Sequence, residues 1–81
     1  MAGGATQEKF ERTLVTQRIR ELYEESGLNQ GEFAAKVGIC QSGVSRFLKL
    51  GDMPDSVSLF RIALACRVSV DWLVGLKDER R

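Results

Sequence analysis

The chain has 81 residues, of which 43% are hydrophobic and 28% charged, and its formal net charge is +1. This length allows one domain with one modest core, and the composition is that of an ordinary globular protein. A charge so close to zero neither supports nor excludes binding to nucleic acid, so any such function has to be argued from the arrangement of the residues.

The catalytic and metal-binding chemistry open to the chain is narrow. It has no histidine and only two cysteines, Cys40 and Cys66. A four-ligand Cys/His zinc site within one chain and a histidine-based nucleophilic triad are therefore excluded. The sequence also contains no phosphate-binding glycine loop, so we expect neither an enzyme nor a bound cofactor or metal.

The sequence shows no targeting signal. It has no basic-then-apolar leader and no apolar run near eighteen residues. We therefore expect a cytoplasmic protein without a membrane partner, in which both cysteines are free thiols.

The N-terminal third of the chain predicts one long helix. Residues 1–7 carry no pattern and are expected to form a flexible arm. Apolar residues then recur at three- to five-residue steps from Phe10 to Tyr23 and are followed by Gly27. This periodicity, with a glycine as C-cap, predicts a first helix over roughly residues 8–26.

The second and third helices are predicted to be short. Asn29 is a good N-cap for the second, and Gly38 ends it after about two turns. The third begins near Gln41 and runs to a loop at Gly51–Pro54. Helices this short are stable only when they pack against their neighbours.

The rest of the chain predicts two more helices. Asp55 or Ser56 caps a fourth helix, and Ser69 caps a short fifth helix that Gly75 ends. Residues 77–81 are expected to form a flexible tail. Strand signals are missing, so the prediction is an all-α, compact five-helix bundle.

The most informative stretch covers residues 30–48. Ala34 is small enough to let a neighbouring helix approach closely, and Gly38 permits the positive φ of a sharp turn. The residues expected to fill the angle between the two helices are Val37, Ile39, Val44 and Phe47. These features together, at this spacing, predict a helix-turn-helix.

Several spaced motifs extend this pattern over most of the chain. They are Arg18–Leu22, Gly27–Gln30, Ala34, Gly38, Gln41–Arg46, Ile62-Ala63 and Val68–Leu73. Through them the chain resembles the phage repressor and Cro type of helix-turn-helix protein, the XRE family. The resemblance implies a lambda-repressor-like domain over residues 8–76, with the helix-turn-helix in its second and third helices, that binds double-stranded DNA.

The resemblance also implies which residues meet the DNA. Gln41, Ser42 and Arg46 would contact bases in the major groove. The residue types suit this role, because glutamine pairs with adenine, arginine with guanine, and serine with several base edges. The residues expected to contact the DNA backbone are Asn29, Gln30, Ser45 and Lys49. The alternative is that these are ordinary solvated helix residues.

Two departures from the family pattern lie in and beside the third helix. Cys40 replaces the usual Ser or Thr cap, and a thiol caps poorly; a redox switch at this thiol is the less favoured alternative. Tyr23 and Leu48 stand where many relatives have an ion pair, and we predict that they pack together instead.

A third departure from the family pattern is the presence of acidic residues in the loop after the third helix. Asp52 and Asp55 in the loop after the third helix would repel phosphate, which predicts a modest salt dependence of binding. The basic residues that are candidates to compensate are Lys9, Arg18, Arg20 and Lys36.

Relatives of this type bind palindromic operators as homodimers, which implies a repressor with two copies on adjacent major grooves. The candidate dimer residues are Val70, Val74 and Leu76. The alternative is an antitoxin or other module that grips a protein partner, and exposure of Phe10 would favour it.

Overall fold

The computed structural model describes the backbone of residues 3–81 and the side chains of residues 13–81. It contains five helices: α1 (Gly3–Ser26), α2 (Gln30–Val37), α3 (Gln41–Lys49), α4 (Ser56–Cys66) and α5 (Val70–Leu73). No strand occurs in residues 3–81. The predicted all-α, five-helix fold is confirmed.

The first helix starts earlier than predicted, at Gly3 rather than near residue 8. Most of the expected arm at 1–7 is therefore helical. This stretch contains no proline, and each residue added to an existing helix contributes a further hydrogen bond. The side chains of Phe10 and Lys9 lie outside the described residues.

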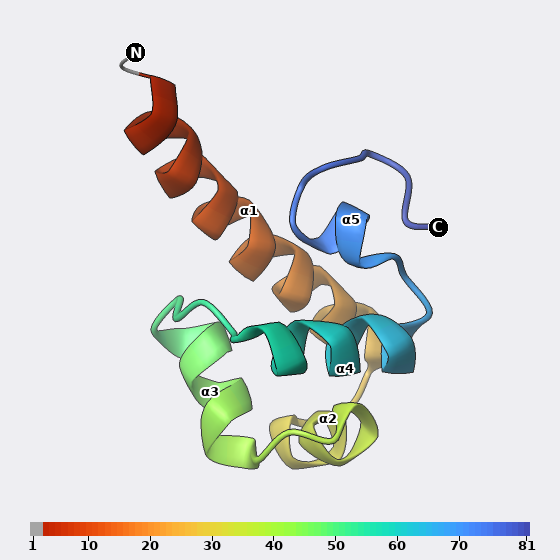
Figure 1. Cartoon of the computed structure of the whole chain (residues 1–81). Coiled ribbons are helices and arrows are strands. Elements are labelled where there is room, and N and C mark those ends of the chain that lie inside the picture. The colour runs from red at the N-terminus through yellow and green to blue at the C-terminus, as the bar shows by residue number, and fades with distance from the viewer. Residues whose placement is uncertain (1–2) are drawn as a thin grey trace.

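All five helices contribute to one core. Figure 1 shows α1 as a long diagonal helix, with α2 and α3 at its lower end, α4 crossing in front and α5 beside its middle. The buried hydrophobic residues that form this core are Val15, Ile19, Leu22, Phe33, Ala34, Val37, Val44, Phe47, Leu48, Ile62, Ala63, Trp72 and Leu73. Because α2, α3 and α5 are too short to be stable alone, this shared core holds them in place.

Both ends of α2, including the turn into α3, have the predicted construction. The Asn29 side chain accepts a hydrogen bond from the Glu32 amide at 2.8 Å, and the Glu32 carboxylate accepts one from the Asn29 amide at 3.0 Å. At the other end Gly38 adopts φ 74°, and its N–H donates to the Ala34 carbonyl. This left-handed glycine turns the chain sharply into α3.

The structure shows which residues cap α4 and α5; for α4 the sequence offered two candidates. The Asp55 carboxylate, rather than Ser56, caps α4 by accepting from the Ser58 amide at 2.9 Å. The Ser69 hydroxyl accepts from the Trp72 amide at 3.0 Å and caps α5. As expected, α3 has no side-chain cap at Cys40.

The C-terminal segment is held against the body of the protein, whereas the sequence predicts a free tail. The Arg80 guanidinium bonds both carboxylate oxygens of Glu25, at 2.7 and 2.6 Å. It also lies 4.8 Å from the centre of the Trp72 ring, and Arg18 lies 4.7 Å from the same centre. The cation–π and ion-pair contacts join α1, α5 and the segment after α5.

Tyr23 and Leu48 are both part of the packed interior, so the mutual exposure that would contradict their predicted contact is not found. The ring of Tyr23 meets that of Phe33 edge-on, with 5.4 Å between centroids. Arg20 donates a hydrogen bond to the Leu48 carbonyl. The aromatic pair thus links α1 to α2, and the charged donor to a helix carbonyl links α1 to α3.

Candidate nucleic-acid interface

The third helix, α3, has one buried and one exposed face. Val44, Phe47 and Leu48 point into the core. Gln41, Ser42 and Arg46 are all exposed on the remaining surface. Ser42 and Arg46 are four residues apart and therefore share a face of the helix. The three residues predicted to contact bases are thus brought together on solvent-facing turns.

The Gln41 side chain lies against the first turn of α2. Its Oε1 atom is 3.4 Å from the place where a Cβ on Gly31 would be, and the Asn29 side-chain oxygen is 3.5 Å from the same point. These are ordinary contact distances, so the space beside Gly31 does not require a glycine. The contact does place the Gln41 side chain beside the residues at the start of α2 that are predicted to contact the DNA backbone.

The residues predicted to contact the DNA backbone flank this exposed face. Asn29 and Gln30 lie at the start of α2, beside Gln41, and Gln30 is half-buried. Lys49 is exposed at the far end of α3, about 12 Å along the helix axis from Gln41. Ser45 is half-buried between the two ends. The side-chain oxygen of Asn29 is already used in the cap of α2, so the part of this side chain that remains available to a phosphate is its NH₂ donor.

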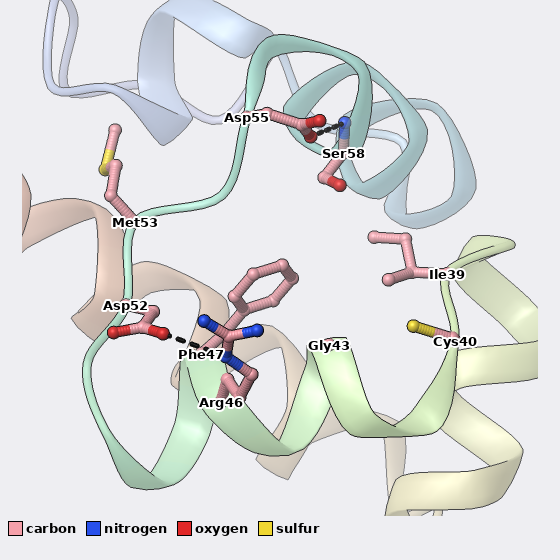
Figure 2. Close-up of a pocket in the computed structure, with 9 residues that line it drawn as sticks. All are labelled: Ile39, Cys40, Gly43, Arg46, Phe47, Asp52, Met53, Asp55 and Ser58. Carbon is pink, nitrogen blue, oxygen red and sulfur yellow. Dashed lines mark hydrogen bonds and ion pairs between the residues drawn. The ribbon is translucent and has the colours of Figure 1, made fainter.

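Arg46 is paired with an acid of the following loop. Its Nε donates to the Asp52 carboxylate at 3.1 Å, and both side chains are open to solvent. Figure 2 shows the pair at the edge of a cavity of about 280 Å³ between α3, the loop and the start of α4. Its lining residues are Ile39, Cys40, Gly43, Arg46, Phe47, Asp52, Met53, Asp55 and Ser58. Hydrogen bonds from Ser58 lower the pKa of Asp55, which stays ionised in this wall.

The three candidate dimer residues differ in exposure. Val70 and Val74 are half-buried against the core, whereas Leu76 is 72% exposed. Val74 and Leu76 also line an apolar cavity of about 250 Å³ together with Val15 and Met53. An apolar surface is therefore available around Leu76, and Val70 contributes mainly to the packing of α5.

The family model described as helix-turn-helix matches residues 19–73, a span that contains the α2–α3 turn and the whole exposed face of α3. The chain belongs to this helix-turn-helix family. It is a DNA-binding regulator of the Cro and phage repressor type, the XRE class. No curated protein and no solved structure is similar enough to the chain to count as a match. No helix within the described residues is long and apolar enough to cross a membrane.

Two of the basic residues considered for the DNA surface of this helix-turn-helix protein form hydrogen bonds within the protein instead. Arg18 donates to the carbonyl of Trp72, and Arg20 to that of Leu48. They brace α1 against α5 and α3, so the expectation that they assist DNA binding is not supported. Lys36 is exposed on α2 and remains a candidate.

The pKa values of the two thiols are shifted in opposite directions. A hydrogen bond with Ser42, then one from the Gly43 amide, with Arg46 nearby, holds the pKa of the exposed Cys40 thiol below its ordinary value. Burial raises the pKa of Cys66, which packs partly against the core. Cys40 is therefore the thiol that ionises at lower pH.

We expect Cys40 to be alkylated by iodoacetamide at a lower pH than Cys66, because the thiolate is the nucleophile. The Cys66→Ala and Cys40→Ala variants isolate the two reactions, whose rates are followed by mass spectrometry across a pH series. In the Cys66→Ala background, Ser42→Ala should move the Cys40 midpoint upward. Equal midpoints for the two thiols would contradict this prediction.

Proposed function

We propose that this helix-turn-helix protein is a transcriptional repressor that binds a palindromic operator as a homodimer. The observation that carries the proposal is the exposure of Gln41, Ser42 and Arg46 on one accessible surface of α3, directly after the α2–α3 turn. A helix with polar, hydrogen-bonding side chains on its exposed first turns fits the major groove of B-DNA.

Each residue has a distinct role in this proposal. Gln41 would pair with an adenine through its amide, Arg46 with a guanine, and Ser42 with a neighbouring base edge. Asn29 and Gln30 at the start of α2 would hold a phosphate, helped by the free N–H groups of that helix end. Ser45 and Lys49 would contact the backbone as further positioning groups.

The homodimer would form on the apolar surface around Leu76, with Val74 at its edge. Val70 would contribute indirectly, by packing α5 against the core. A dimer would place its two α3 helices about 34 Å apart, on successive turns of one face of the duplex. The proposed protein acts in the cytoplasm, where its DNA is, and its function needs neither catalysis nor a cofactor.

Selection from a random duplex library tests this proposal. We expect the protein to enrich a palindromic site with half-sites about one helical turn apart. Binding to that site should also protect Cys40 from alkylation, since its thiol lies at the start of α3 beside Ser42. The absence of any enriched duplex would overturn the proposed binding to a specific operator, and an enriched site without symmetry would overturn the homodimer.

A protein-partner module, such as an antitoxin, is the second candidate, and one observation favours it. Val57, Phe60 and Leu64 of α4 are 55%, 55% and 80% exposed. Their spacing of three and four residues places them in one row on α4. An exposed apolar row on a helix is a common docking surface for another protein. A protein that enriches no duplex would be assigned to this second class.

A further inference from the structure

The loop after α3 is folded back onto the helix by its own backbone. The amides of Leu50 and Asp52 both donate to the Arg46 carbonyl, at 3.0 and 3.3 Å. Gly51 between them adopts φ 69°, the left-handed conformation that glycine enters at no steric cost. The main chain therefore fixes residue 52 next to Arg46 before any side chain is considered.

The side chains use this placement to form an ion pair. Asp52 accepts from Arg46 Nε at 3.1 Å, and the two side chains are 42% and 67% exposed. An ion pair this exposed contributes little to folding, because water screens it and two flexible side chains must be held. The bond occupies only Nε. The two terminal nitrogens keep four N–H groups, the fork that matches O6 and N7 of guanine.

We propose that Asp52 is a specificity-determining residue that orients Arg46 toward one guanine; this inference rests on the proposed DNA-binding function. By holding the guanidinium in the free protein, Asp52 reduces the side-chain freedom that Arg46 loses on binding. Its negative charge at the same time weakens attraction to phosphates in every sequence. Asp52 thus favours the correct site and disfavours all others.

The test compares four variants with the wild-type chain. Asp52→Asn removes the charge at nearly constant shape, and Arg46→Ala removes the oriented group. The double variant combines the two changes. Asp78→Asn makes the same change of charge at an exposed residue after α5, outside the helix-turn-helix. For each we measure the dissociation constant for the selected duplex and for a scrambled duplex, and repeat the library selection.

We expect Asp52→Asn to bind the scrambled duplex about two- to fivefold more tightly, because one repulsive charge is gone. Its preference for the selected duplex should fall about three- to tenfold, with relaxation at the base pair that Arg46→Ala also relaxes. In the Arg46→Ala background, Asp52→Asn should leave the base preference unchanged. Thermal unfolding of the variants should match that of the wild type.

Two results would overturn the inference while leaving DNA binding intact. In the first, Asp52→Asn tightens both duplexes by the same factor, so that Asp52 acts only through its charge. In the second, relaxation occurs at a base pair that does not depend on Arg46. Failure of the wild-type chain to enrich any duplex would instead overturn the proposed function itself, and this inference with it.

Discussion

Replacing Gln41 with alanine is expected to weaken binding to the selected operator by about 5- to 150-fold per half-site, the range that one bidentate base contact supplies. Gln41 is the first residue of α3 and is exposed, with its side chain packed beside Gly31. Alanine keeps the helix but removes both the donor and the acceptor. We therefore expect relaxed preference at one base pair, and only a small change in binding to scrambled DNA.

A matched control is Gln17→Ala, which makes the same change at an exposed position of α1. It should bind the selected duplex as the wild type does. Titration of labelled duplexes at one fixed salt concentration gives both constants. If Gln41→Ala and Gln17→Ala bind alike, Gln41 is a solvated helix residue and the predicted base contact is wrong.

The largest effect on folding is expected from Phe33→Ala, which should lower the free energy of unfolding by about 3–5 kcal/mol. Phe33 is fully buried, and its ring forms a T-shaped pair with the ring of Tyr23. It anchors α2, which has 8 residues and is too short to be stable alone. A chain of this size has a net stability of roughly 4–12 kcal/mol. The variant should therefore lose a large part of its cooperative transition in urea, followed by circular dichroism.

The control for this variant is Leu64→Ala, a large-to-small change at a side chain that is 80% exposed. It should change the free energy of unfolding by no more than about 0.5 kcal/mol. Similar losses for the two variants would show that Leu64 is covered in solution, for instance by a second copy, and that the monomeric core does not account for the stability.

Much of the fold was predictable because it depends on neighbours in the sequence. Asn29 and Ser69 cap their helices, and Gly38 turns the chain, through contacts with residues at most four positions away. The same local rules placed Gln41 and Ser42 on an exposed first turn. Their contacts with DNA stay predictions, since exposure alone does not identify a ligand.

Other features depend on which segments pack together, and no local pattern indicates them. Examples are the placement of Arg80 on Trp72 and the use of Arg20 as a brace to the end of α3. The exposure of Phe60 is a further case, because a helix pattern marks residues as apolar without saying whether a neighbour covers them.

The sequence by itself determined the number of helices, the N-caps of α2 and α5 and the helix-turn-helix, since these follow from short-range hydrogen bonds and from the 3.6-residue period. Only the tertiary structure decided how the charges are used. Arg18 and Arg20 were committed to main-chain carbonyls of other helices, while Arg46 was paired with Asp52 by a backbone turn. The physical reason is that a long charged side chain can reach several partners, and the packing of the helices decides which of them it meets.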